Sequence, residues 1–129
     1  MVAGALSSGI DFATNLASAL ADSPRYASET LLIITHLTSG GFYDHVVPPK
    51  LPDTDPAGLP YGARVPFLAL GPFVRKNQIS HAVLEHSSLT KFVEWNWLDG
   101  KTGQLGGRDG SVNNLGSLFD PAMTGHVVP

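Results

Sequence analysis

The sequence has no cysteine among its 129 residues, which excludes disulfide bonds and thiolate metal sites. It has no run of about 18 or more apolar residues, so we expect no membrane span. Basic residues are few and scattered: eight lysines and arginines stand against eleven acidic residues, for a net charge of −3. Nucleic-acid binding is not expected, because contacts with phosphates need clustered positive charge. Residues 1–6 lack a basic segment and a long apolar core, so they are a poor secretory signal, and two alternatives stay open: a cytoplasmic chain or the loss of an upstream part.

What the sequence does contain is typical of a globular protein, with 43% hydrophobic and 15% charged residues. Its length predicts a single domain over residues 1–129. Apolar residues recur at helical spacing from residue 10 to about residue 21, after a possible capping box at Ser8 and Asp11. The pair Ser23-Pro24 should end this helix.

Two apolar, β-branched runs, residues 30–35 and 65–70, predict strands that are buried on both faces. A long proline-rich loop, residues 47–62, separates them. Ser87 or Ser88 should cap a second helix, whose apolar stripe is Leu89, Phe92, Val93 and Trp97. The glycine-rich tail should be mostly loop with one helical turn near residues 113–119. This order predicts an α/β fold with a small, mostly parallel sheet flanked by helices.

Four of the five histidines lie in the two connections that follow the strands, and His126 near the end is assigned no role. His36 and His45 come after the first strand, and His81 and His86 come after the second. Ligands bind at the carboxyl ends of parallel strands, so the sequence predicts a site where these connections emerge. Imidazole and carboxylate groups there are ligands that zinc, manganese or iron accept.

Each of these residues also has a structural interpretation. Asp44 can cap the turn at Gly40-Gly41 instead of binding a ligand. His45 can orient the loop through a backbone hydrogen bond. The N-terminus of the helix beside His86 favours anions, which makes a phosphate pocket plausible there, but capping alone would give the same sequence.

Several segments together resemble one known family. The strand and glycine-hinged loop from Leu31 to Pro49, with Thr-Ser-Gly-Gly-Phe-Tyr-Asp-His-Val-Val-Pro-Pro at its end, closely resemble the signature of the phosphoesterase family, which includes bacterial phospholipases C and an acid phosphatase. Residues 61–68, 80–95 and 108–120 are similar to further motifs of that family. The resemblance covers nearly the whole chain and corresponds to the C-terminal portion of longer members. It implies half of an alkaline-phosphatase-like domain, ester hydrolysis, a divalent metal and frequent export.

The chain departs from the family pattern at two points. The family's acidic metal-binding pair is replaced by Leu37-Thr38, and no Glu-Asn pair occurs in the sequence. The family mechanism, in which a metal-activated hydroxyl group attacks phosphorus, would lack both ligands and nucleophile.

Two functions are therefore kept open. The first is an ester hydrolase, acting on phosphate esters, with a histidine as base; the alternative is a degenerate, non-catalytic binding or assembly module. The expected partners are a small-molecule ester and further copies of the chain, since an uncovered sheet edge favours association, and no organic cofactor is expected. The site residues assigned are His45, His86 and Asp44 for catalysis, Arg108 and Ser87 for substrate binding, and His36, Asp44 and His45 for a zinc, manganese or iron ion.

Overall fold

The computed structural model of the chain describes residues 2–50 and 58–124. His126 and the middle of the proline-rich loop lie outside the described residues. The chain divides into two compact units, residues 1–37 with 65–74 and residues 38–64 with 75–129. Each unit is described by itself below, and the single domain over residues 1–129 stays a prediction.

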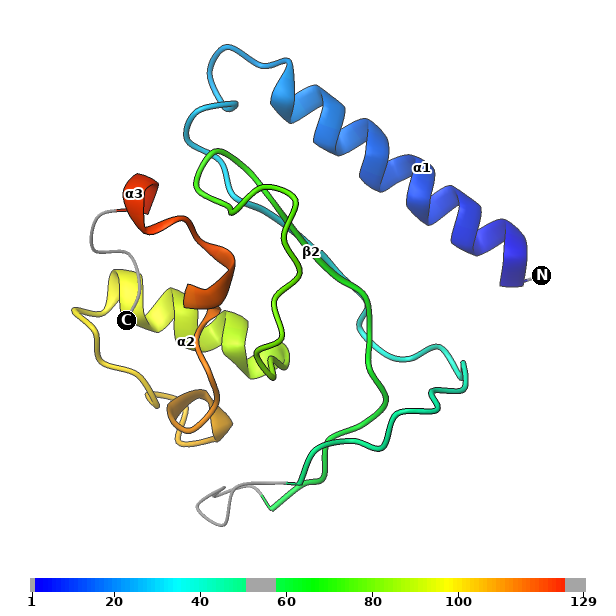
Figure 1. Ribbon diagram of the computed structural model, residues 1–129, viewed down its shortest axis with the longest axis vertical. Helices are drawn as coiled ribbons and strands as arrows, with labels where there is room; N and C mark the ends of the chain where they lie inside the picture. Colours follow the sequence, from blue (N-terminus) through cyan, green and yellow to red (C-terminus); the bar gives the residue numbers. More distant parts are fainter. Residues whose placement is uncertain (1, 51–57, 125–129) are drawn as a thin grey trace. The chain divides into compact units, whose positions relative to one another are not determined.

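The first unit begins with a long helix, α1, which spans Val2–Ala21 (Figure 1). It ends just before Ser23-Pro24, as the sequence predicted. The predicted capping box is wrong, because Ser8 lies inside the helix and cannot act as its N-cap. The predicted apolar stripe of α1 is only partly buried: Ile10 and Leu16 are 58% and 36% exposed. No helix in the described part of the chain is long and apolar enough to cross a membrane.

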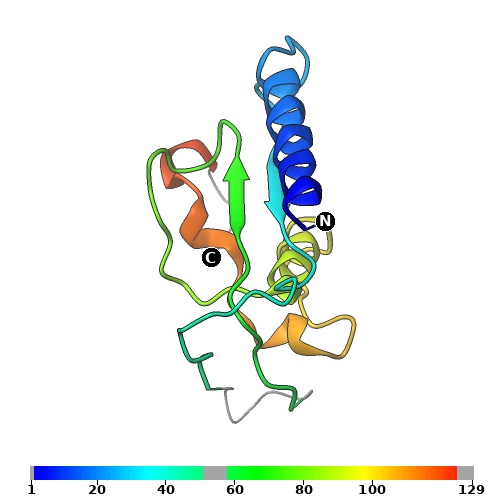
Figure 2. The same ribbon diagram turned by 90° about the vertical axis from the view of Figure 1, so that its right-hand side faces the viewer.

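The strands of the first unit are β1, Leu32–Thr35, and β2, Phe67–Leu70. They pair antiparallel, with Leu32 opposite Leu70 and Thr35 opposite Phe67, and their arrows point in opposite directions in Figure 2. The predicted mostly parallel sheet is therefore wrong. A parallel pair usually needs a helical crossover, and the described part of the connection between these strands contains no helix.

Antiparallel pairing places the carboxyl ends of β1 and β2 at opposite ends of the ladder. The expectation that the two histidine-bearing connections leave from one sheet edge is therefore wrong. The strands are also less buried than predicted: β1 is half-buried throughout, and Leu68 and Leu70 of β2 are 56% and 40% exposed. Gly71 after β2 has a φ of 147°, and a Cβ there would lie 2.5 Å from the carbonyl oxygen of Thr30, so this turn requires glycine.

The second unit is built around α2, His86–Trp97, with the short 3₁₀ helices η1, Arg108–Gly110, and η2, Leu115–Leu118, beside it (Figure 1). A short helix, α3, Pro121–Thr124, follows. The position of η2 confirms the predicted helical turn.

Among the residues whose burial the structure describes, the buried apolar ones all belong to this second unit: Phe92, Val112, Leu115 and Phe119. The rings of Phe92 and Phe119 stack with their centroids 5.3 Å apart. The predicted apolar stripe of α2 is only partly buried, because Val93 and Trp97 are 53% and 69% exposed. The core is therefore small and holds α2 against the C-terminal segment.

A five-residue loop, residues 103–107, is held by two buried carboxylates. The side chain of Glu94 in α2 accepts hydrogen bonds from the backbone N–H groups of Gly103 and Gln104, at 2.9 and 3.0 Å. The side chain of Asp109 in η1 accepts from those of Leu105 and Gly107, both at 3.0 Å. Glu94 and Asp109 are only 4% and 3% exposed. Two acidic residues thus take the place of apolar packing in fixing this loop.

Candidate functional site

The loop after β1 begins with a turn that only glycine adopts easily. Gly40 and Gly41 have φ values of 65° and 80°, in the left-handed region. The N–H of Phe42 donates to the carbonyl oxygen of Ser39 at 3.2 Å, which closes the turn. This turn brings the chain to Asp44 and His45.

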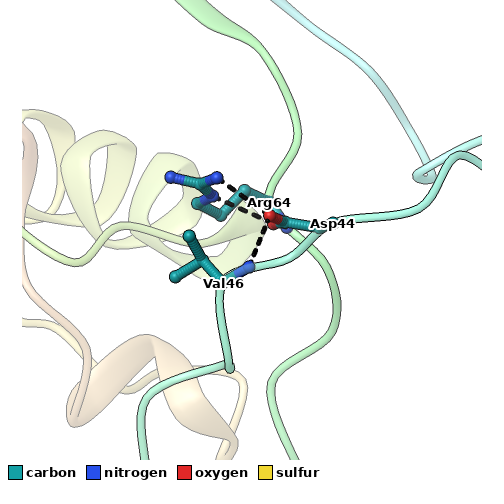
Figure 3. Close-up of polar contacts among 3 residues, drawn as sticks. All are labelled: Asp44, Val46 and Arg64. Carbon is teal, nitrogen blue, oxygen red and sulfur yellow. Dashed lines mark hydrogen bonds and ion pairs between the residues drawn. The ribbon is translucent and has the colours of Figure 1, made fainter.

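The Asp44 carboxylate accepts four hydrogen bonds (Figure 3). Its Oδ1 accepts from the N–H of Val46 at 3.0 Å and from the Arg64 terminal nitrogen Nη2 at 2.8 Å. Its Oδ2 accepts from Nε and from the backbone N–H of the same arginine, at 2.9 and 3.0 Å. We call this arrangement the Asp44–Arg64 clamp. It joins the loop after β1 to the segment before β2.

The clamp decides the charge and availability of Asp44. The hydrogen bonds from the Arg64 side chain, then those from the backbone N–H groups of Val46 and Arg64, hold the pKa of this carboxyl well below its usual range. A carboxylate offers about four acceptor positions, and the clamp fills them all. The predicted catalytic and metal-binding roles of Asp44 stay predictions. Its contacts favour a structural role, but with Val46 and Arg64 and not with the Gly40-Gly41 turn that the sequence suggested.

His45 lies between Asp44 and Val46, which are joined by a hydrogen bond to the Asp44 side chain, and it is exposed. His81 and His86 are exposed in the same unit, whereas His36 belongs to the first unit. No group of three or more histidine, cysteine, aspartate or glutamate side chains in the described part of the chain is arranged to hold a metal ion. The predicted metal set of His36, Asp44 and His45 therefore gains no support from the geometry.

His86 and Ser87 are the first two residues of α2, and Glu85 is its N-cap. The predicted cap at Ser87 or Ser88 is wrong by two or three positions. Ser88 still takes part, because its hydroxyl accepts a hydrogen bond from the backbone N–H of Glu85 at 3.1 Å. The α2 N-terminus thus already carries a carboxylate, which weakens the argument for a phosphate pocket formed by its amide groups alone.

Arg108, the predicted substrate-binding arginine, is engaged inside the protein. Its guanidinium lies 3.0 Å from the carboxylate of Glu85, and these two side chains are 13% and 15% exposed. It also donates to the carbonyl oxygen of Leu59 at 3.0 Å and lies 4.5 Å above the ring of Tyr61. Arg108 therefore ties the start of α2 to the loop before β2, and its substrate-binding role stays a prediction.

The sequence predicted no role for Arg64, although its side chain donates two, and its backbone one, of the four hydrogen bonds that the Asp44 carboxylate accepts. The signal was present. Both residues lie in the two segments that most resemble family motifs, residues 31–49 and 61–68. A basic residue in one such segment and an acidic residue in the other are candidates for an ion pair.

Comparisons with known proteins agree with this resemblance. A model of the Phosphoesterase family matches residues 4–98. Phospholipase C B of Mycobacterium tuberculosis is 30% identical over 122 residues, which cover 78% of this chain and 23% of the relative. Non-hemolytic phospholipase C of Burkholderia pseudomallei is 30% identical over 107 residues, covering 67% and 15%. Non-specific phospholipase C6 of Arabidopsis thaliana is 33% identical over 95 residues, covering 59% and 18%.

The chain thus spans less than a quarter of the length of each of these relatives. No solved structure matches it. The family match includes the glycine turn, the clamp and all of α2, and it extends over more than half of the chain. The chain therefore belongs to the Phosphoesterase family.

Proposed function

We propose that the chain hydrolyses phosphate esters, with His45 and His86 as its acid–base groups. The observation that carries this proposal is the family match, because it runs through both segments that bear these histidines. Both side chains are exposed, so a substrate can reach them. The relatives named above are phospholipases C, and we extend the proposal to phosphate esters of lipids on that basis.

The chemistry needs one proton acceptor and one proton donor. A neutral imidazole takes a proton from water as the water oxygen attacks phosphorus. A protonated imidazole returns a proton to the oxygen of the leaving alcohol as its bond to phosphorus breaks. His45 and His86 are the candidates for these two steps. The pH profiles of their alanine variants will show which one is the proton acceptor and which one is the proton donor.

The proposal is tested with the purified chain and three chromogenic substrates: a nitrophenyl phosphate, a nitrophenyl phosphodiester and a nitrophenyl acetate. We expect phosphate-ester turnover above a heat-inactivated control. The rate should change over about pH 5 to 8, where imidazole groups change charge. Absence of turnover with both phosphate esters would contradict the proposal, whether or not the acetate ester is hydrolysed.

A zinc, manganese or iron ion held by His36, Asp44 and His45 would be the metal-dependent form of this proposal, and these residues do not fit it well. All acceptor positions of Asp44 are filled, and the described residues contain no cluster of three such ligands. We therefore expect the purified protein to contain no stoichiometric metal by elemental analysis, and its Tm to stay unchanged when these ions are added. Bound metal that is lost in His45→Ala would restore the metal-dependent form.

The second candidate function is a non-catalytic binding or assembly module. It is favoured by the internal contacts of Asp44 and Arg108, which engage two of the predicted site residues with other protein groups. Activity separates the two candidates: a folded, stable chain without turnover is the result that the module predicts.

Self-association is a further prediction of this proposal. In the described residues the sheet has only two strands, so each strand has an outer edge without a partner strand. Such edges tend to pair, and two identical edges can do so across a twofold axis. We expect a homodimer or larger oligomer by light scattering. Leu68→Lys on β2 should weaken association, while Ile79→Lys, at an apolar position that is even more exposed and outside the strands, should not. A 13.6 kDa monomer at micromolar concentration would contradict this expectation.

A further inference from the structure

The turn around His45 is not held by burial. Tyr43 and Val47 on either side are 91% and 84% exposed, and Val46 is 38% exposed. His45 itself is exposed. Packing therefore does little to select one conformation of this turn. Its geometry has to come from hydrogen bonds, and in the described part of the chain four of them converge on the Asp44 side chain (Figure 3).

One of these bonds closes a ring around His45. The Asp44 side chain accepts from the N–H of Val46 at 3.0 Å, which is the geometry of an Asx turn. The backbone of the histidine is enclosed between the two ends of this bond. Rotating the Asp44 carboxylate away would open the ring and release the backbone that carries the imidazole.

Arg64 prevents that rotation. Its guanidinium contacts the carboxylate through Nε and Nη2, and its backbone N–H adds a third contact from the same residue. A planar, two-point contact fixes orientation as well as distance. A lysine at this position would offer one flexible ammonium group and could not reproduce this two-point contact.

We propose that Arg64 and Asp44 are positioning residues for His45. They hold the turn so that the imidazole is presented in one direction to the substrate. The catalytic consequence rests on the proposed function, while the effect on the conformation of residue 45 does not. Neither residue touches the reacting atoms in this proposal, because the carboxylate is saturated by donors from the protein.

The size of the effect follows from the sensitivity of proton transfer to geometry. Displacing a catalytic group by about 1 Å can lower a rate by about 10²-fold. Arg64→Gln should remove the two-point contact between the guanidinium and the Asp44 carboxylate and leave a turn that samples several conformations. We expect kcat to fall by roughly tenfold to 10²-fold and KM to change by less than about threefold, since loss of positioning acts on the chemical step.

The experiment is a double-mutant cycle with Asp44→Asn, Arg64→Gln and their combination. If the clamp acts as one unit, the double variant should be about as active as the worse single variant, because the second change removes nothing more. Arg64→Lys should be intermediate, and Arg25→Lys, an exposed arginine of the first unit, should keep full activity. Additive losses, or full activity of Arg64→Gln, would overturn the inference.

An NMR measurement separates failure of this inference from failure of the proposed function. His45→Ala identifies the imidazole signal of His45 by its disappearance. In Arg64→Gln and Asp44→Asn this signal should shift or broaden, and in Arg25→Lys it should not. If His45→Ala keeps full activity, the proposed function fails and the NMR result decides the positioning role. If the signal is unchanged in Arg64→Gln, the positioning role fails whatever the activity shows.

Discussion

His45→Ala and His86→Ala are each expected to lower kcat/KM for phosphate-ester hydrolysis by about 10²-fold or more. This is the usual scale for the loss of a general base or acid. Because both side chains are exposed, their truncation removes little buried surface, and both variants should keep the Tm of the wild type. The two should differ in pH dependence: loss of the base should flatten the acidic limb of the rate profile, and loss of the acid should flatten the alkaline limb.

His81→Ala is the matched control. This histidine is also exposed and lies five residues before His86 in the same connection, so the same truncation there tests for nonspecific effects. It should keep activity within about twofold of the wild type. Full activity in either His45→Ala or His86→Ala would remove that residue from the mechanism. A comparable loss in all three variants would show that the effect is not specific to the proposed site.

The positions of the elements could be predicted from the sequence better than their arrangement. Apolar, β-branched runs placed both strands within two residues of their observed bounds. Their direction could not be predicted in this way, because the connection of residues 36–66 is long enough for either a crossover or a return. The connection returns directly, so the strands pair antiparallel. The prediction that both histidine-bearing connections leave from one sheet edge is wrong for this reason.

In the loop after β1, the local turn could be predicted from the sequence, and the long-range contact could not. The glycines at positions 40 and 41 predicted a turn, and their positive φ values confirm it. Asp44 was predicted either as a ligand or as a cap, and the choice depended on Arg64, twenty residues away in the sequence. Long-range ion pairs leave no periodic signal in a single sequence. The identity of the donor therefore had to come from the structure.

The buried acids of the second unit were not predicted at all. A glutamate in a helix is ordinarily exposed, whereas the neighbouring Val93 belongs to the predicted apolar stripe of α2. The structure reverses the two: Val93 is 53% exposed and Glu94 is 4% exposed. The reason is the glycine-rich loop beside α2, whose backbone N–H groups need acceptors and find them in this side chain.

Glu94→Ala is accordingly expected to lower the free energy of unfolding by about 2–4 kcal/mol, because it leaves two partly buried N–H groups, those of Gly103 and Gln104, without their acceptor. The measurement is chemical denaturation at neutral pH. Glu29→Ala, an exposed glutamate of the first unit, should change this free energy by less than about 0.5 kcal/mol. A loss below about 1 kcal/mol in Glu94→Ala would mean that water replaces the carboxylate and that the loop does not depend on it.

The pH dependence of stability gives an independent check on the same loop. Burial alone would raise the pKa of Asp109, but hydrogen bonds from the backbone N–H groups of Leu105 and Gly107 lower it below its ordinary value. An aspartate with a lowered folded-state pKa contributes stability above its unfolded value of about 3.9, and this contribution is lost as the pH falls through the folded-state pKa. Asp109→Asn should therefore destabilise the protein at pH 7 and cost less near pH 2. An equal loss at both pH values would show that the charge of Asp109 does not hold the loop.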